Sequence, residues 1–539
     1  MGASSTSSNA TSSPASSSMA STGTSGSMGS TGSTTSATST SSTSSTSSTT
    51  GDAGHDAGAL PESRLIGPMT GNSVASQTPT FTWMLPAGLT TAHVEICGTD
   101  NKCKTPTSLS PVTGAGGTAV SSTPSAVLPR GATFWRVVTT GGAPSPIWQF
   151  YAPGPNALKT ASKASWPSFA DIEGDGYADL LIQTGNGDTT EELQGSATGL
   201  QTVIAGSGAV GPGRGVGDID GDGLTDYASI GNIPNVGPGV QVSFGSPTGF
   251  PQIRSQLVAA ALGSVAVVAG DINGDGYADV VSTDGVNVYV ADGSPTGLAM
   301  MPTQTFAVPA ASIAFNQLAA VGDINGDGYA DVVAGDQSAA TVGRAYVYLG
   351  GPTGLATSPK IMNAPIGAGG TFGEFVAEAG DLNGDGYCDV VISANGTTIV
   401  YVYYGSMGGL PASPQVTYTP GSGGLKTTPW GAGDVNGDGY SDLLLTGAGL
   451  SKTVFYFGGP QGVPASAASP SATLAFGFTY FQLACGFVGD LNGDGLSDFA
   501  TGRNSSGNID VIYGTAGTFP MTPNVTLPLS FPPGGGPPF

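Results

Sequence analysis

A nine-residue acidic motif occurs seven times between residues 171 and 498 of this 539-residue chain. Each copy reads Asp-x-(Asn/Asp/Glu)-Gly-Asp-Gly-x-x-Asp, and we number the copies loop 1 to loop 7 in chain order. Side-chain oxygens therefore recur at motif positions 1, 3, 5 and 9, as in Asp271, Asn273, Asp275 and Asp279 of loop 3. Sets of carboxylate and amide oxygens at such spacing are typical of sites for hard divalent cations, above all Ca²⁺.

The remaining motif positions also fit a calcium loop. Position 7 can supply its main-chain carbonyl, so its side chain need not be polar. The glycines at positions 4 and 6 allow the positive φ angles that a tight loop requires. We therefore predict up to seven Ca²⁺ ions, one per repeat. The predicted ligands are Asp171, Glu173, Asp175, Tyr177 and Asp179; Asp218, Asp220, Asp222, Leu224 and Asp226; Asp271, Asn273, Asp275, Tyr277 and Asp279; Asp323, Asn325, Asp327, Tyr329 and Asp331; Asp381, Asn383, Asp385, Tyr387 and Asp389; Asp434, Asn436, Asp438, Tyr440 and Asp442; and Asp490, Asn492, Asp494, Leu496 and Asp498.

Other interpretations of the motif fit less well. Asp, Asn and Gly also form ordinary turns, but carboxylates at fixed offsets in seven copies favour cation binding. Mg²⁺ prefers rigid octahedral sites that retain water, and a transition metal would call for Cys or His among the ligands. An EF-hand would place a Glu at position 12, where this chain has residues such as Ser282 and Ala334.

The sequence between the loops predicts β-strands. The loops begin at steps of 47, 53, 52, 58, 53 and 56 residues. Each loop runs into an apolar segment, and a further segment alternates, as in 286–290, 345–349 and 399–403. Turns such as Gly293-Ser294-Pro295-Thr296-Gly297 follow. Four antiparallel strands recurring at this period are typical of propeller blades, so we predict an all-β fold with a seven-bladed β-propeller over residues 160–529.

At this level the chain resembles a known family, the FG-GAP (VCBS-type) repeat propellers found in the head of integrin α subunits and in bacterial surface proteins. The resemblance covers about residues 163–529 and is clearest where Phe372-Gly373 precedes the calcium loop from Asp381 to Tyr387. Gly447-Ala448-Gly449 partly matches the Gly-Ala-Pro of the family. The resemblance implies Ca²⁺ in hairpin loops on one face of the disc and ligand contacts on other loops.

Two different segments precede the predicted propeller. Residues 1–62 are rich in Ser, Thr and Gly, so we predict a disordered stalk or linker. Residues 63–153 contain strand-like segments around Trp83 and Trp135 and resemble a fibronectin type III or Ig-like β-sandwich, in which both tryptophans would be core residues. Cys97 and Cys103 are close enough to form a disulfide across a hairpin. Residues 530–539 are predicted to be a disordered tail.

Charge and hydropathy limit the partners of the protein. The formal net charge is −23, and 23 of the 37 acidic residues lie within the seven loops. This acidity disfavours nucleic acid as a partner. No stretch is long and apolar enough to predict a transmembrane span. We expect an extracellular or cell-surface protein, for which a signal, lipid anchor or envelope anchor would be encoded upstream of Met1.

The predicted function is binding and not catalysis. The predicted propeller contains no histidine, since His55 and His93 both precede it, and the loops account for most of its carboxylates. We expect a calcium-binding adhesion module that recognises protein or glycan through its propeller loops. Two alternatives are a carbohydrate-active enzyme of the polysaccharide lyase type on a propeller scaffold and a purely structural surface protein.

Overall fold

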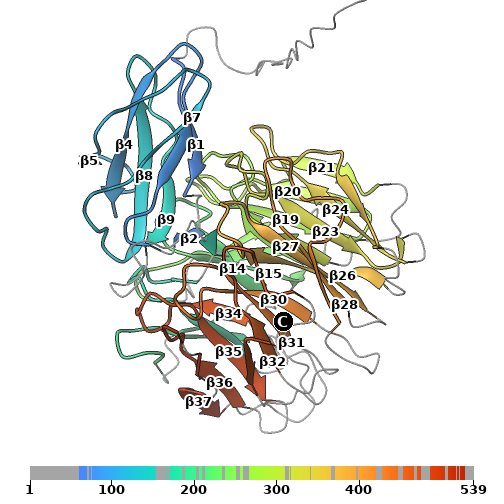
Figure 1. Cartoon of the computed structure of the whole chain (residues 1–539). Helices are drawn as coiled ribbons and strands as arrows, with labels where there is room; N and C mark the ends of the chain where they lie inside the picture. The colour runs from blue at the N-terminus through green and yellow to red at the C-terminus, as the bar shows by residue number, and fades with distance from the viewer. Residues whose placement is uncertain are drawn as a thin grey trace, which may run out of the picture. The chain divides into compact units, whose positions relative to one another are not determined.

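The described residues of the computed structural model form 37 β-strands, and Figure 1 shows how these strands are arranged. None of the helices in its described part is long and apolar enough to cross a membrane. The structure describes residues 60–528 except for gaps at 69–71, 75, 153–164, 167–169, 185–188, 202–205, 209–212, 234–236, 250–254, 259–265, 310–314, 316, 340–341, 366–370, 396–398, 420–427, 447–452, 466–469, 475–485, 504–507, 518 and 521. The predicted stalk up to residue 59, the tail and the segment 447–449 therefore lie outside the described residues.

Two sheets form the first part of the described chain, which we call the sandwich (residues 60–152). The smaller sheet has the order β1 (Arg64–Gly67), β3 (Phe81–Met84), β7 (Ala119–Ser122). The larger sheet has the order β10 (Ser165–Trp166), β2 (Asn72–Val74), β9 (Trp148–Ala152), β8 (Gly131–Thr139), β4 (Thr91–Gly98), β5 (Thr107–Ser108), and β6 (Val112–Thr113) also pairs with β4. All pairings are antiparallel except that of β2 with β9.

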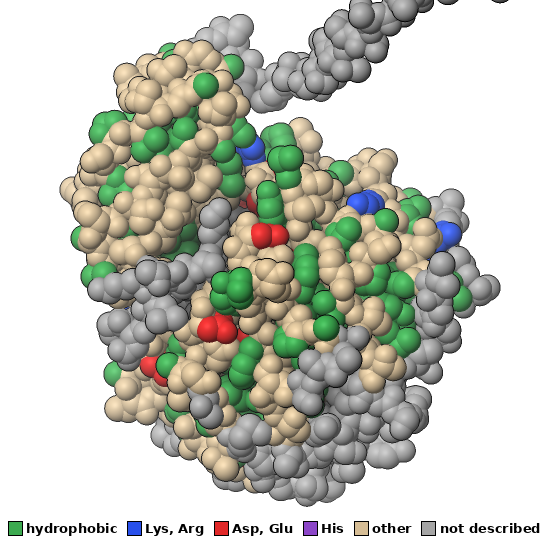
Figure 2. Space-filling view, in the orientation of Figure 1, with side chains coloured by type: hydrophobic (Ala, Val, Ile, Leu, Met, Phe, Trp, Pro, Cys, Tyr) green, Lys and Arg blue, Asp and Glu red, His purple; other side chains and the backbone are tan. Residues whose placement is uncertain are grey.

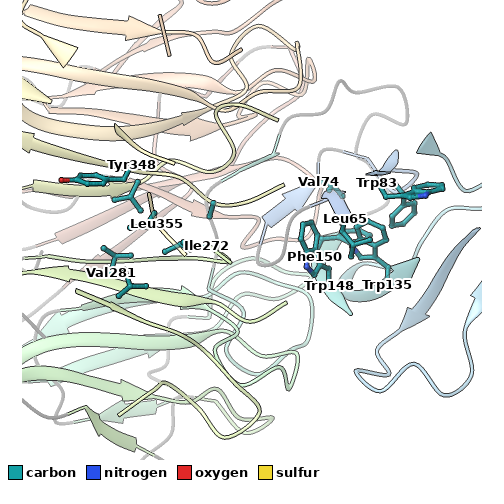
Figure 3. Packing of buried hydrophobic residues seen from close by; sticks show 14 of the residues in the cluster. Leu65, Val74, Trp83, Trp135, Trp148, Phe150, Ile272, Val281, Tyr348 and Leu355 are labelled. Atoms are coloured by element: carbon teal, nitrogen blue, oxygen red, sulfur yellow. The ribbon is translucent and has the colours of Figure 1, made fainter. Parts of the chain in front are cut away.

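Aromatic side chains from both sheets fill the sandwich core (Figure 3). Trp83 and Trp135 are fully buried, which confirms their prediction as core residues. Trp135 meets Trp148 edge to face with ring centroids 6.1 Å apart, a favoured aromatic geometry. A disulfide joins Cys97 and Cys103, as predicted from their spacing.

Seven antiparallel sheets follow, one for each acidic loop, and we call them blades 1 to 7. They show that the chain has a propeller-like all-β fold, as predicted. In chain order the blades are β11 (Leu180–Thr184), β12 (Thr189–Leu193), β13 (Gly206–Gly208); β14 (Gly213–Gly217), β15 (Asp226–Ile233), β16 (Gly237–Ser243), β17 (Ser255–Val258); β18 (Ala266–Gly270), β19 (Asp279–Thr283), β20 (Asn287–Ala291), β21 (Gln304–Ala307); β22 (Gln317–Ala320), β23 (Val332–Asp336), β24 (Arg344–Tyr348), β25 (Lys360–Asn363); β26 (Thr371–Gly380), β27 (Asp389–Asn395), β28 (Ile399–Tyr403), β29 (Val416–Tyr418); β30 (Thr428–Gly433), β31 (Asp442–Thr446), β32 (Thr453–Tyr456), β33 (Ala472–Leu474); and β34 (Gly486–Gly489), β35 (Asp498–Arg503), β36 (Asn508–Ile512), β37 (Val525–Pro528).

Blade 1 differs from the prediction of four strands per blade. Its sheet contains three strands within the described residues. The segment that precedes loop 1 contributes β10 to the larger sandwich sheet, where Ser165 and Trp166 pair with β2. The pattern of apolar residues could not reveal this exchange, because a strand has the same local sequence whichever sheet it joins.

Hydrogen bonds between neighbouring blades run in a closed cycle. In every repeat the amide at motif position 8 donates to the carbonyl at position 1 of the preceding loop, at 2.9–3.0 Å. The seven bonds are Thr225 to Asp171, Ala278 to Asp218, Ala330 to Asp271, Cys388 to Asp323, Ser441 to Asp381, Ser497 to Asp434 and Ala178 to Asp490. The last bond joins blade 1 to blade 7, so each acidic loop is hydrogen-bonded to the loops of both neighbouring blades.

Candidate metal sites

The aspartate at position 1 organises the backbone of each loop. All seven are buried, with at most 7% of their surface exposed. In loop 3, one carboxylate oxygen of Asp271 accepts the amides of Gly274 and Asp275 at 2.7 and 3.1 Å, and the other accepts that of Gly276 at 2.9 Å. Loops 1, 2, 4, 5 and 6 repeat this set of three bonds. The loop is thus curled around its first carboxylate.

The aspartate at position 9 connects its loop to the turn that follows the third strand of the same blade. In blade 3, Oδ2 of Asp279 accepts the amide of Ile272 at 3.0 Å and Oδ1 accepts that of Gly293 at 2.9 Å. Equivalent pairs of bonds occur in all seven blades. Position 9 therefore has a structural role besides that of a predicted ligand, because an ionised carboxylate has about four acceptor sites and the amides use two.

The sequence placed the glycine at 293 in a turn but did not predict that its amide donates to position 9. A Cβ added at Gly293 would lie 2.4 Å from the carbonyl oxygen of Ala278 and 2.8 Å from that of Ile219. The same glycine occurs at 195, 245, 350, 405, 458 and 514, where a Cβ would lie 2.2–2.8 Å from the corresponding carbonyl oxygen. Its recurrence just after each alternating strand was a usable signal, since close backbone approach is one reason for glycine in a repeat.

Position 7 also has a packing role that the prediction of a carbonyl ligand did not include. In six pairs of neighbouring loops its side chain lies against the glycine at position 4 of the preceding loop, and this glycine has a positive φ angle, 79° at Gly274. A Cβ at Gly274 would lie 2.7 Å from the ring of Tyr329, and one at Gly493 would lie 2.4 Å from the ring of Tyr177. Large side chains at position 7 and glycine at position 4 are thus matched between neighbouring loops.

Positions 3 and 5 place further oxygens over the curled backbone. In all seven loops the carboxylate at position 5 accepts the amide of position 7 at 2.9–3.2 Å. In loop 2, carboxylate oxygens of Asp218, Asp220 and Asp222 lie within 4.8 Å of one another. In loops 3 to 7 position 3 is Asn, and its side-chain oxygen accepts the amide of position 5 at 2.8–3.0 Å.

Loop 1 differs from the others in its inner contacts. Carboxylate oxygens of Asp171, Glu173 and Asp179 lie within 4.8 Å of one another. Glu173 is also within hydrogen-bonding contact of Glu192, a buried residue of β12. The longer side chain at position 3 thus turns toward position 9 and β12, so loop 1 gathers a different set of carboxylates from loop 2.

The burial of these carboxylates perturbs their titration. Burial raises the pKa of Asp171, Asp218 and Asp271 to about 8, with nearby carboxylates adding to the effect and loop amides opposing it. Burial raises the pKa of Asp323 to about 6 and that of Asp490 to about 7 in the same way. For the aspartates at position 9 the pKa is also raised, again chiefly by burial. Clustered buried carboxylates of this kind need either protons or a cation for charge compensation.

The donor chemistry of the loops fits Ca²⁺. Each loop offers oxygen ligands only, with carboxylates at positions 1, 5 and 9 and an amide or carboxylate oxygen at position 3. Among the described residues, three carboxylates gather within 4.8 Å of one another in loop 1 and in loop 2. On the face drawn in Figure 2, acidic side chains form separate small patches and not one continuous acidic surface. This distribution is expected if carboxylates are grouped by loop, so each group can be considered a separate candidate site.

Comparison with known protein families agrees with the repeat structure. A family profile described as FG-GAP-like repeat matches residues 218–282, 323–391 and 381–445. The chain therefore contains FG-GAP-like repeats, as predicted. Each match begins at an acidic loop (loop 2, 4 or 5), continues through the rest of that blade and ends in the second strand of the next blade.

Individual relatives are similar over part of their length. Integrin alpha-IIb of Mus musculus is 34% identical over 161 residues, which cover 26% of this chain and 16% of that protein. Integrin alpha-8 of Mus musculus is 28% identical over 213 residues, which cover 35% of this chain and 20% of that protein. Among solved structures, a lectin of Agrocybe aegerita that recognises non-reducing terminal N-acetylglucosamine has a TM-score of 0.35 and 16% identity, covering 72% of this chain and 92% of the lectin. The chain thus spans less than a quarter of the integrin relatives named here.

Proposed function

We propose that the seven acidic loops bind Ca²⁺, one ion per blade. The observation that carries this proposal is the repeated placement of a buried aspartate at position 1 beside oxygen donors at positions 3, 5 and 9. A bound Ca²⁺ would neutralise each group of carboxylates and link residues that are otherwise mutually repulsive. Because neighbouring loops are joined by hydrogen bonds, occupancy of the sites would stabilise the whole cycle of blades.

We further propose that the propeller-like part is an adhesion module that recognises a protein or a glycan outside the cell. Support comes from the FG-GAP-like repeats and the similarity to integrin alpha chains. The disulfide between Cys97 and Cys103 supports an oxidising compartment such as the cell exterior. We propose binding and not catalysis, because the loops use 23 of the 37 acidic residues of the chain.

Metal binding and ligand binding can be tested in sequence on the same protein. Elemental analysis after dialysis against Ca²⁺ should find close to seven ions per chain, and Asp275→Ala should remove one. The calcium-loaded protein is then applied to glycan arrays and to panels of extracellular-matrix proteins. We expect saturable binding that is lost in EDTA, and no binding across both panels would contradict the adhesion proposal.

A further inference from the structure

Three hydrogen bonds connect the sandwich to backbone carbonyls of loops 2 and 3. Asn101 Nδ2 donates to the carbonyl oxygen of Gly221 at 2.8 Å, and Gln149 Nε2 donates to that of Gly223 at 3.3 Å. Trp148 Nε1 donates to the carbonyl oxygen of Gly274 at 3.2 Å. The acceptors are at motif positions 4 and 6, which are not predicted ligand positions. The sandwich therefore contacts the loops at backbone atoms that a cation in the loop would leave free.

The glycine at position 6 lies against the sandwich in each of loops 1 to 4. A Cβ at Gly276 would lie 2.4 Å from the carbonyl oxygen of Ile147, and a Cβ at Gly328 would lie 2.4 Å from that of Leu65. A Cβ at Gly223 would lie 3.2 Å from the ring of Phe134. In loop 1, a Cβ at Gly176 would lie 3.1 Å from the Cα of Gly131 in the sandwich. Four consecutive loops thus form a continuous docking surface whose fit depends on their backbone shape.

Two arginines of the sandwich add contacts to the tyrosines at position 7. The guanidinium of Arg130 lies 3.4 Å from the ring centroid of Tyr177 in loop 1, and that of Arg64 lies 5.6 Å from the ring centroid of Tyr329 in loop 4. Both distances are within the range of cation–π attraction. Asn101 itself belongs to a short segment closed by the disulfide between Cys97 and Cys103, which restricts its freedom before docking.

We propose that Ca²⁺ in loops 1 to 4 locks the sandwich onto the propeller-like part, so that metal occupancy and domain docking are thermodynamically coupled. This inference rests on the proposed Ca²⁺ binding. The sandwich recognises carbonyls and glycine surfaces whose positions are set by the curl of each loop, and the cation holds that curl. Loss of Ca²⁺ releases the contacts of several loops at once and gives the sandwich freedom to move.

The test compares matched aspartates at position 5 of two loops. Asp275→Ala affects loop 3, which bonds to Trp148, whereas Asp438→Ala affects loop 6, which lies opposite loops 2 and 3 in the cyclic order. A donor and an acceptor fluorophore are introduced as unnatural amino acids at the exposed positions Thr113 and Thr248. Single-molecule energy transfer in saturating Ca²⁺ then reports the undocked fraction, and elemental analysis reports the number of ions.

Asp275→Ala should increase the undocked fraction about five- to tenfold, because a docking contact is lost, whereas Asp438→Ala should leave it as in the unsubstituted protein. Each substitution should remove one ion. If both variants lose an ion but have the same undocked fraction, the coupling between metal occupancy and docking is refuted and the proposed Ca²⁺ binding stands. If the unsubstituted protein binds no Ca²⁺, the proposed function fails as well, and the two failures are thereby distinguished.

A variant on the sandwich side makes the test independent of the metal ligands. Coupling is reciprocal, so removing a docking bond must also weaken metal binding. Asn101→Ala should lower the calcium affinity of loop 2, which Asn101 contacts, about fivefold in calorimetric titrations. The exposed Thr105→Ala in the neighbouring segment should leave these affinities unchanged. Equal calcium affinities for the two variants would overturn the proposal even if Asp275→Ala fails to fold.

Discussion

Replacing the aspartate at position 9 should be more harmful than replacing the one at position 5 of the same loop. In loop 3 both oxygens of Asp279 accept buried backbone amides, those of Gly293 and Ile272, whereas Asp275 accepts the amide of Tyr277 through one oxygen. In Asp279→Asn the new NH₂ group must face one of these amides. In Asp275→Asn the carbonyl of Asn can still accept its single bond. Both variants lose the same negative charge from the cation site.

The difference between the two variants can be worked out from these contacts. Asp279→Asn loses one charge-assisted hydrogen bond and leaves a buried amide without an acceptor, which together cost about 3 kcal/mol. The loss of cation stabilisation is common to both variants and cancels in the comparison. We therefore expect Asp279→Asn to be less stable than Asp275→Asn by about 2–3 kcal/mol in saturating Ca²⁺. In urea titrations this corresponds to a midpoint lower by about 1 M.

The assay is urea unfolding followed by circular dichroism, with the same calcium concentration for the unsubstituted protein and both variants. Comparable slopes of the transitions are needed for the midpoints to be compared. If the two variants unfold at the same urea concentration, position 9 acts through the cation alone. That result would refute the bridging role that we assign to its two oxygens.

Three further predictions concern the same loops. Burial raises the pKa of Asp271 from 3.8 to about 8, so in EDTA the folded state retains a proton that the unfolded chain has lost, and stability should fall as pH rises from 4 to 8. Ca²⁺ binds ionised carboxylates, so adding Ca²⁺ should raise the melting temperature of the protein more at pH 8 than at pH 5. A larger rise at pH 5 would contradict calcium binding by these carboxylates. Ala278→Ser should change the free energy of unfolding by less than about 0.5 kcal/mol. In loops 2 and 6 a hydroxyl at this position already accepts a hydrogen bond from a backbone amide of the preceding loop. A larger loss of stability on urea unfolding would contradict this prediction. Gly293→Ala should lower the free energy of unfolding by about 3 kcal/mol, because the new Cβ would lie 2.4 Å from a carbonyl oxygen. Gly408→Ala, where the nearest atom would be 3.9 Å from the Cβ, should be nearly neutral. Equal melting temperatures for the two variants would contradict this prediction.

The sequence allowed the all-β, propeller-like repeat to be predicted because its signals are local. Alternation in 286–290 and the turn at 293–297 correspond to β20 and the turn after it. The positive φ angles of Gly274 and Gly276 confirm the reason given for glycine at positions 4 and 6. These features depend on residues near one another in the chain, which is why periodicity and residue type were sufficient.

The sequence did not reveal features that depend on residues far apart. The bridging bonds of position 9 join residues 14 to 19 positions apart, and the contact of Tyr177 with Gly493 joins the first and last repeats. Docking of Asn101 and Trp148 on loops 2 and 3 joins residues more than 100 positions apart. Nothing in the local pattern around Asn101 or Trp148 distinguishes a docking residue from a loop or core residue. The predicted ligand set itself stays a prediction.

The most direct test of the account is the number of calcium ions held by the purified chain. Isothermal titration of protein first stripped with EDTA, combined with elemental analysis, should give close to seven Ca²⁺ per chain and a melting temperature that rises as the sites fill. A chain that stays free of calcium at millimolar supply, with a melting temperature unaffected by the metal, would contradict the account.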